Sequence, residues 1–518
     1  MPDYNLELCK TSSCPSLGMK KLILATLILL ALHVKCQTAF KTLQPAEMQK
    51  ELAIIRSAFD TLHPGTYRYN TRQQIDGYFR QAHNRVVEPI GEDQYDILLA
   101  QLATKIKCGH TYLNYWNQEK TLTDHLYSKS LLPFLFRLIG GHIIITHNLS
   151  ENMAVKPGTE ILSINGIRSG RIIDSLLTVS QSDGNHGMAR KLDNINIEPL
   201  DADTSNYNLF DIYFPLIFQE NFNAAGYQLK LKSNIGKMSI VHVKSLGRTA
   251  RLSIYNNRFG ILPVHEKNWS LKFLGKETAC FTIGDFETWE WKADYRKYLD
   301  SIFTLLKLKQ VENLIVDIRG NGGGDDEARD EVFSYLTDKP FGCDDPMHRR
   351  FRFLAVPDTL LPYLKTWNKS FKAPKNTEDY IQIPGGWYES KADINTACTP
   401  MQPKSNCFTG RKFLIIDGRN SSTTFTLAKL FRTAGTGEII GETTGGNQQG
   451  INGGQFFFLY LPYSKIEIDI PLVWGAYPGK RPDTGIEPDT PVGLSALSIS
   501  RNDDLALALV LKEIAAAK

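Results

Sequence analysis

The spacing of apolar residues changes along the chain and divides it into three parts. In residues 39–128, apolar side chains recur at helical spacing in 51–62 and 95–106, which predicts a small N-terminal helical cap. Residues 129–235 contain β-rich runs such as 142–146, and they predict a small β module. The remaining residues alternate between apolar strands and amphipathic helices, which is typical of an α/β core.

The α/β core is expected to occupy residues 236–518. Its predicted order is strand 278–283, helix 294–308, strand 314–318, helix 327–336, strand 412–416, helix 424–432 and strand 438–441. Residues 338–410 interrupt this series, are rich in proline, glycine and cysteine, and are expected to form an inserted loop region over the sheet. A β-hairpin, 455–461 with 465–470, and a helix over 503–514 are predicted to complete the chain.

A glycine-rich loop follows the strand predicted at 314–318. It reads Gly-Asn-Gly-Gly-Gly at 320–324 and continues into Asp325 and Asp326 at the start of a helix. Glycine lets backbone N–H groups approach a ligand closely, and a helix N-terminus favours an anion. A phosphate loop would end in Gly-Lys-Ser/Thr and a dinucleotide loop would read G-x-G-x-x-G, whereas two aspartates would repel phosphate. The loop is therefore interpreted as a site for the oxyanion of an attacked carbonyl.

A second strand, turn and helix occupy residues 413–432. The turn ends in four hydroxyl residues, Ser421, Ser422, Thr423 and Thr424. Acyl-transfer enzymes place a nucleophile at the C-terminal end of a strand with a helix N-terminus behind it, but the same residue types are also common helix caps. No G-x-S-x-G elbow occurs in the chain, so an α/β-hydrolase is not supported.

Four motifs in this order resemble those of the C-terminal processing (tail-specific) and tricorn-core serine peptidases. They are Leu-Ile-Val-Asp-Ile-Arg-Gly-Asn-Gly-Gly-Gly at 314–324, the turn around Ser422, Ile-Ile-Gly-Glu-Thr-Thr-Gly-Gly at 439–446 and Gly-Ile-Glu-Pro-Asp at 485–489. The resemblance implies a crotonase/ClpP-like ββα spiral for the catalytic core. It also implies the helical cap and a PDZ-like module, which would bind peptide ends by adding a strand to a sheet edge. A plain structural β insert is the alternative for the module.

The resemblance also assigns the nucleophile and the oxyanion hole. When the helix after the turn is registered against the family, Ser422 rather than Ser421 occupies the nucleophile position. The backbone N–H groups of Gly322 or Gly323 and of Thr423 would form the oxyanion hole. Family members usually carry a small residue where this chain has Thr423.

Two kinds of base occur in this family, and the residues favour histidine. The processing branch uses a lysine after a G-x-x-T-x-G loop, but here that loop, 441–446, is followed by Asn447, whose amide cannot accept the proton. The tricorn branch uses a histidine from the N-terminal helical part, and His110, in a Gly-His-Thr run at a helix end, matches that place. An imidazole has an ordinary pKa of about 6.5 and suits a general base near neutral pH.

The acid that would orient the base is predicted to be Asp483. The tricorn pattern has a glutamate shortly before the motif at 485–489, and Asp483 is the nearest match. Glu442 and Glu487 remain alternatives. The tricorn pattern also has a serine just before the histidine, where this chain has Gly109, so that orienting hydroxyl is absent.

Residues 1–38 have the form of a leader that contains a secretory signal peptide. From Met19, a basic start precedes a largely apolar run at 22–32, which is too short for a stable membrane span. This predicts export to the periplasm or secretion. Cys36 offers a lipid anchor as an alternative, although the residues before it lack the small side chains of a lipobox.

Composition, charge and cysteine spacing limit the classes of partner and cofactor. A chain with 42% hydrophobic and 22% charged residues is ordinary for a soluble globular protein, and a net charge of +4 is too weak to indicate nucleic acid or an anionic membrane. Cys343, Cys398 and Cys407 fall in one loop-rich segment, where one disulfide is expected. No C-x-x-C pair indicates a metal site, and no cofactor is expected.

The favoured hypothesis is an exported serine endopeptidase that acts on peptide or protein substrates. Ser422 would attack the peptide carbonyl and His110 would accept its proton. The alternative is a catalytically inactive family member that binds peptides or hydrophobic ligands. A coenzyme-A-using crotonase would share the fold and the oxyanion chemistry, but it would not explain the signal peptide or the serine turn. The sequence indicates no oligomeric state.

Overall fold

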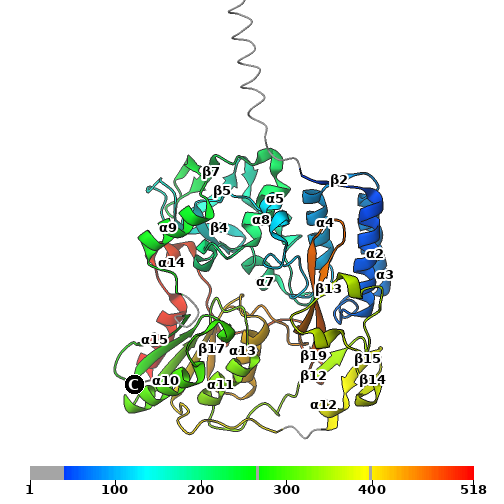
Figure 1. Cartoon of the computed structure of the whole chain (residues 1–518). Coiled ribbons are helices and arrows are strands. Elements are labelled where there is room, and N and C mark those ends of the chain that lie inside the picture. Colours follow the sequence, from blue (N-terminus) through cyan, green and yellow to red (C-terminus); the bar gives the residue numbers. More distant parts are fainter. Residues whose placement is uncertain (1–39, 264–267, 396–398, 518) are drawn as a thin grey trace, which may run out of the picture. The chain divides into compact units, whose positions relative to one another are not determined.

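The four strands predicted for the core, together with β9 and β20, form one six-stranded sheet in the spatial order β20-β17-β16-β11-β10-β9. Strand β17 of this sheet is labelled in Figure 1. All neighbouring strands are parallel except β9, which is antiparallel to β10. The strands are β9 (Trp269–Phe273), β10 (Thr278–Ile283), β11 (Asn313–Asp317), β16 (Arg411–Ile416), β17 (Glu438–Gly441) and β20 (Thr490–Pro491). The α/β class predicted from the alternating pattern is confirmed.

The structure is a computed structural model that describes residues 40–263, 268–395 and 399–517. The chain divides into two compact units, Met1–Lys41 and Thr42–Lys518, and the second unit contains every described helix and strand. The predicted leader, with Met19 and Cys36, lies outside the described residues.

Helices cover both faces of the core sheet. Helices α10, α11 and α13 share a buried cluster with Val316 and other side chains on one face, and α15 packs through Val510 against Ile315 on the other. Burial on both faces explains why the strands read as continuous apolar runs. The helices of this part are α10 (Tyr295–Leu308), α11 (Asp326–Leu336), α12 (Lys391–Asn395), α13 (Ser422–Thr433), α14 (Ala496–Arg501) and α15 (Leu505–Ala516).

The predicted hairpin is the centre of a second six-stranded sheet, in the order β13-β18-β19-β12-β15-β14. Strands β12 to β15 come from the region expected to be an inserted loop, and β12 pairs antiparallel with β19. These strands are short and partly exposed, so they leave little alternation in the sequence. The strands are β12 (His348–Phe351), β13 (Leu364–Lys365), β14 (Tyr380–Ile383), β15 (Trp387–Ser390), β18 (Asn452–Tyr460) and β19 (Glu467–Ala476).

The β module contains an antiparallel sheet in the order β3-β4-β5-β7-β8, with β6 beside β5. Strand β8 pairs with β7 along its whole length, although it lies beyond the boundary expected at residue 235. The elements are β3 (Phe134–Ile139), β4 (His142–Asn148), β5 (Glu160–Ile164), β6 (Ile167–Arg168), β7 (Gly226–Lys232), β8 (Met238–Lys244), α6 (Ser169–Leu177), α7 (Met188–Asp193), α8 (Leu209–Ile217) and α9 (Arg248–Phe259).

The N-terminal part is helical, as its apolar spacing predicts. Helix α4 ends shortly before His110, so the loop that follows it carries the predicted base. The elements are β1 (Thr42–Leu43), α2 (Pro45–Thr61), α3 (Arg72–Arg85), β2 (Ile90–Gly91), α4 (Glu92–Thr104) and α5 (Lys120–Leu126).

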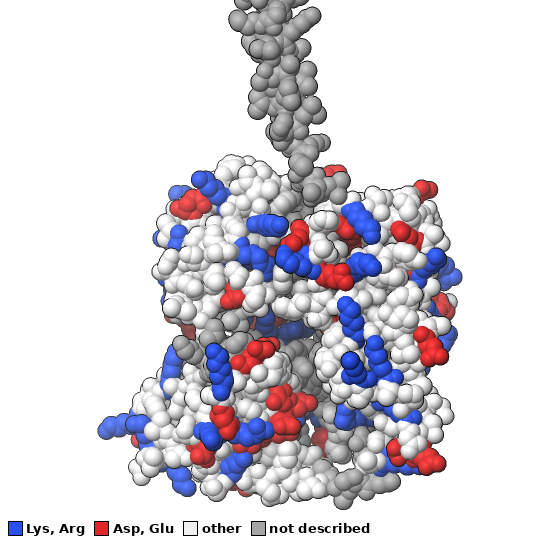
Figure 2. Space-filling view, in the orientation of Figure 1, with Lys and Arg blue, Asp and Glu red and all other residues white. Residues whose placement is uncertain are grey.

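The surface charges and the helix lengths can be compared with the composition of the sequence. On the face shown in Figure 2, lysine and arginine side chains are interspersed with aspartate and glutamate side chains. Within the described residues, no helix combines the length and apolar character needed to cross a membrane.

A buried pair of carboxyl groups on β19 contacts the segment after the predicted base. Asp469 accepts hydrogen bonds from the Asn114 side-chain amide at 2.7 Å and from that of Asn117 at 3.3 Å. Glu467 is fully buried, and neither of its oxygens has a hydrogen-bond donor among the described residues. Burial, together with the charge of Asp469, raises the pKa of Glu467 well above its ordinary value. Folding therefore favours the protonated form of Glu467 relative to the unfolded chain.

The variant Glu467→Gln is expected to raise the thermal unfolding midpoint at pH 8 by about 2–4 °C. A carboxyl whose folded pKa is raised binds a proton that the unfolded chain releases, so folding loses stability as pH rises above the unfolded pKa. The neutral amide removes this cost, and the difference from wild type should disappear near pH 4. The exposed Glu88→Gln change is the control. An equal gain at both pH values would contradict the raised pKa of Glu467.

Candidate active site

Ser422 lies at the first position of α13, in the turn after β16. Its φ is +50°, a left-handed conformation that residues other than glycine rarely adopt and that costs on the order of 1–3 kcal/mol. The side chain lines a cavity of about 1060 Å³ that His110 also lines. The neighbouring Ser421 is buried, and its hydroxyl donates to the Gly322 carbonyl at 3.0 Å. Of the two serines, Ser422 is the one that the cavity exposes.

The glycine loop after β11 lies directly against Ser422. A Cβ placed on Gly323 would be 2.8 Å from the Ser422 Cβ and 3.3 Å from its Oγ. The Gly323 N–H donates to the Asn321 Oδ1 at 2.9 Å, so this predicted oxyanion donor already has an acceptor. No atom lies within 4 Å of a Cβ placed on Gly322.

Thr423 joins the start of α13 to the glycine loop. Its Oγ1 lies 2.8 Å from the Gly324 carbonyl oxygen and 2.8 Å from an Asp326 carboxylate oxygen. Within the described residues, no acceptor is hydrogen-bonded to the Thr423 N–H. The Thr423 side chain thus connects the two turns. The Thr423 backbone N–H, next to Ser422 in the chain, remains free to donate a hydrogen bond.

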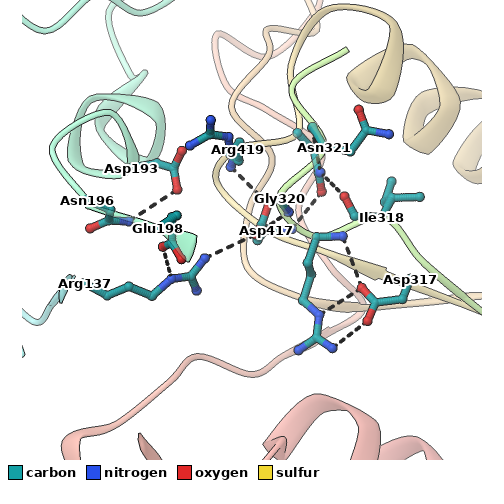
Figure 3. Close-up of polar contacts among 12 residues, drawn as sticks. Arg137, Asp193, Asn196, Glu198, Asp317, Ile318, Gly320, Asn321, Asp417 and Arg419 are labelled. Atoms are coloured by element: carbon teal, nitrogen blue, oxygen red, sulfur yellow. Dashed lines mark hydrogen bonds and ion pairs between the residues drawn. The ribbon is translucent and has the colours of Figure 1, made fainter. Parts of the chain in front are cut away.

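The buried carboxylate of Asp417 hydrogen-bonds to the glycine loop and to the turn before α13 (Figure 3). Asp417 accepts the Gly320 N–H at 2.9 Å and the Arg419 N–H at 3.1 Å. Arg137, on β3 of the β module, pairs with Glu198 and lies 3.6 Å from Asp417. Burial raises the pKa of Asp417 to about 7, and the Arg137 charge acts in the opposite direction. The β module therefore contacts the carboxylate that holds the glycine loop.

The loop that carries His110 is held by a second, buried histidine. His63 Nδ1 accepts the Gly65 N–H at 2.7 Å, and its Nε2 lies 2.5 Å from the Thr111 Oγ1. Burial lowers the pKa of His63 to about 3, so this ring is neutral and donates from Nε2. Thr111 is fully buried, and its N–H donates to the Cys108 carbonyl at 3.1 Å. These bonds fix the backbone on the C-terminal side of His110.

The His110 ring is neutral and packs against β18. Its centroid lies 5.6 Å from that of Phe456 in an edge-on contact. Burial lowers the pKa of His110, and the charge of Asp183 acts in the opposite direction. The Nδ1 atom is buried and has no hydrogen-bond partner among the described residues. A neutral imidazole in the same cavity as Ser422 is able to accept a proton.

Asp183, for which the sequence predicts no role, lies beside this loop. It is 3% exposed, and its Oδ1 accepts the Gly109 N–H at 2.9 Å. The segment around it reads Gln-Ser-Asp-Gly-Asn-His-Gly at 181–187, which indicates a turn and gives no sign of a long-range contact.

The predicted acid Asp483 has other partners. It accepts hydrogen bonds from the Asn447 side-chain amide at 2.6 Å and from the Asn185 side-chain amide at 2.8 Å. Glu442 and Glu487, the two alternatives, are exposed. Within the described residues, no hydrogen bond joins any of these three carboxylates to His110.

Apolar side chains and paired charges form the wall of the cavity. Trp367 is 61% exposed, its ring centroid lies 5.4 Å from that of Phe456, and both residues line the cavity with His110. Lys429 is paired with Asp345, which also lines the cavity. The cavity therefore combines aromatic surface beside His110 with charged side chains, of which Lys429 and Asp345 compensate each other.

The described residues contain no group of three or more histidine, cysteine, aspartate and glutamate side chains arranged to hold a metal ion. Cys343 is disulfide-bonded and Cys407 is a free thiol, whereas Cys398 lies outside the described residues.

Comparisons with known proteins give a family match and a shared fold. Residues 278–492 match the family model described as peptidase family S41. Among solved structures, the chain is similar to mature CPAF complexed with lactacystin, with a TM-score of 0.58 and 14% identity over 91% of this chain and 97% of that chain. It is also similar to mature CPAF (TM-score 0.56, 15% identity, 88% and 94% covered) and to a putative peptidase from Parabacteroides merdae (0.41, 12%, 91% and 96%). The likeness to CPAF shows a shared fold. No curated protein matches the sequence.

The variant Gly323→Ala is expected to lower the rate of covalent labelling by a fluorophosphonate probe by about 10²-fold or more. The added methyl group would overlap Ser422, and the φ of +129° strains any residue with a Cβ. Gly322→Ala is the matched control, because it has free space and keeps its N–H. Thermal unfolding is used to check that both variants are folded. If folded variants label at equal rates, the close approach of Gly323 to Ser422 does not matter for labelling.

Proposed function

Because the chain belongs to peptidase family S41 and is a serine-type peptidase, we propose that it is an endopeptidase that hydrolyses peptide bonds in exported or extracellular peptides and proteins. The single observation that carries this proposal is the shared cavity. A strained serine at a helix N-terminus, a neutral histidine and a glycine-rich turn all border it.

In the proposed mechanism, Ser422 Oγ attacks the peptide carbonyl while His110 accepts the hydroxyl proton. The oxyanion would be held by the N–H of Thr423 and by those of Gly322 or Gly323. The Gly323 N–H would exchange the Asn321 side-chain oxygen for the oxyanion, because both are acceptors in reach of one donor. His110 then gives the proton to the leaving amine, and water hydrolyses the acyl-enzyme.

The cavity suits an extended peptide segment. It is lined by Ser422 at the start of α13 and by Thr433 at its end, positions about 16 Å apart along the helix axis. About five residues of extended chain span that distance. We propose that residues on one side of the scissile bond bind there.

The proposal includes a spiral arrangement of the core and a PDZ-like role for the β module. A ββα spiral of the crotonase/ClpP kind is supported by the alternation of parallel strands with α10, α11 and α13. A PDZ-like role for the β module is supported by its antiparallel sheet and its helix α6.

Export to the periplasm or secretion is proposed as the setting of the reaction. The support is the form of the sequence after Met19 and the disulfide of Cys343, since disulfides persist in oxidising compartments.

A binding protein without catalysis is the second candidate. The observations that favour it are the occupied Gly323 N–H and the unpaired Nδ1 of His110, because an active site needs a free donor and an oriented base. The apolar cavity would then hold a peptide or another hydrophobic ligand. Substitutions of Ser422 and His110 separate this candidate from the peptidase.

Ser422→Ala is expected to abolish fluorophosphonate labelling and to lower kcat/KM for an unfolded protein substrate by a factor on the order of 10⁴ to 10⁶. Ser421→Ala is the matched control and should keep labelling, since among the described residues that hydroxyl donates to the Gly322 carbonyl and does not line the cavity. Absence of labelling in the wild-type protein would favour the binding protein. Labelling that survives in Ser422→Ala would reassign the nucleophile.

His110→Ala is expected to lower kcat/KM by a similar factor, on the order of 10⁴ to 10⁶, while thermal unfolding stays cooperative. The acidic limb of the wild-type pH profile should lie below about pH 6.5, because burial lowers the pKa of the base and only the neutral ring accepts a proton. The exposed His186→Ala is the control. Full activity in His110→Ala would remove this residue from the mechanism.

A further inference from the structure

We propose that Asp183 is the positioning residue of His110, in the role that the sequence pattern assigns to Asp483. The inference rests on the proposed function, in which His110 is the base. It goes further because it names a carboxylate from a different part of the chain. Asp183 lies between α6 and α7, whereas Asp483 belongs to the loop before β20.

Asp183 approaches the backbone of the residue that precedes His110. Its Oδ1 accepts the Gly109 N–H at 2.9 Å, and a Cβ on Gly109 would lie 2.6 Å from its Oδ2. Both carboxylate oxygens therefore lie against the residue that precedes the base. A side chain at position 109 would overlap the carboxylate, so Gly109 and Asp183 occupy the space together.

This contact explains a departure of the sequence from the tricorn pattern. That pattern has a serine just before the histidine, and this chain has Gly109. A serine Cβ would overlap Asp183 Oδ2. The Asp183 carboxylate therefore occupies the space that a serine side chain at position 109 would need. We infer that it replaces the orienting hydroxyl of that serine.

The charges around His110 also favour Asp183 as its partner. Asp183 is the carboxylate whose charge raises the pKa of His110, against burial, and Arg190 on α7 acts in the opposite direction. From β18, the backbone carbonyl of Asn452 also favours the protonated ring, and Phe456 is uncharged. Burial raises the pKa of Asp183, and His110 is the strongest of the groups that lower it.

A negative charge near His110 would stabilise the protonated form that a general base adopts during the reaction. When His110 takes the serine proton, the buried imidazolium requires a nearby anion. The Nδ1 atom, buried and without a partner in the neutral ring, then carries a proton that needs an acceptor. Asp183 supplies a negative charge against the backbone of Gly109, and it is almost fully buried, so water screens it little.

Asp483 supports the Asp183 loop instead of the base. The Asn447 side-chain amide donates to the Asp483 Oδ1 at 2.6 Å and lies 3.5 Å from the Asp183 backbone carbonyl. The Asn185 N–H also donates to the Asp483 Oδ2, at 3.1 Å. Asp483 therefore helps to fix residues 183–185 from outside.

The test compares Asp183→Asn with Asp483→Asn, two isosteric changes that remove one negative charge each. The pKa of His110 is measured by NMR of protein with labelled histidine in a Ser422→Ala background, and kcat/KM is measured against pH with Ser422 intact. Asp183→Asn should lower the His110 pKa, because its charge raises that pKa, and should move the acidic limb to lower pH. It should also reduce kcat/KM by a factor on the order of 10³ to 10⁴. Asp483→Asn should leave the His110 titration and the acidic limb in place.

The proposal is overturned if Asp183→Asn folds and leaves the His110 titration unchanged, or if Asp483→Asn lowers the His110 pKa. The second outcome can be measured even if Asp183→Asn does not fold. The titration needs no catalysis. Absence of labelling and cleavage in the wild-type protein would therefore refute the proposed peptidase function. The histidine titration would still decide which carboxylate acts on His110.

Discussion

Two turns meet at the carboxyl ends of β11 and β16, and every part of the proposed chemistry depends on how closely their backbones approach. The two strands are parallel neighbours, so their following turns emerge at the same edge of the sheet. Ser421 donates to the Gly322 carbonyl across this contact, and Gly323 has no side chain to hold the turns apart. The backbone of Gly323 therefore lies close to the Ser422 side chain, a closeness that the proposed oxyanion hole requires.

Buried polar groups maintain this approach against the strain at Ser422. Asn420 is fully buried, its side-chain amide donates to the Ile318 carbonyl, and its Oδ1 accepts the Asp417 N–H. Asn321, also fully buried, accepts the Thr424 hydroxyl. Each of these buried amides has a partner, so the turns stay close without the cost of unsatisfied polar atoms. The Arg137 contact with Asp417 adds the β module to this support.

The two turns of the candidate site were predictable because their signals are local and strong. Apolar runs buried on both faces, followed by glycine or hydroxyl residues, indicate parallel strands and their end loops whatever the rest of the chain does. The hairpin strands β18 and β19 were predictable for the same reason. Strands β12 to β15 were missed, because short, partly exposed segments carry little periodicity. Asp183 was missed since its contact with Gly109 joins residues 74 positions apart.

The sequence by itself determined the α/β order and the presence of a glycine loop and a hydroxyl turn after two of its strands. Through resemblance to a family, it also led to the proposal of His110 as base. These features depend on residue types and their spacing, which the chain carries locally. Only the tertiary structure decided which carboxylate lies beside His110, which serine the cavity exposes and which charges compensate one another. Such facts depend on how whole helices and sheets pack, and packing brings together residues whose separation along the chain contains no sign of the contact.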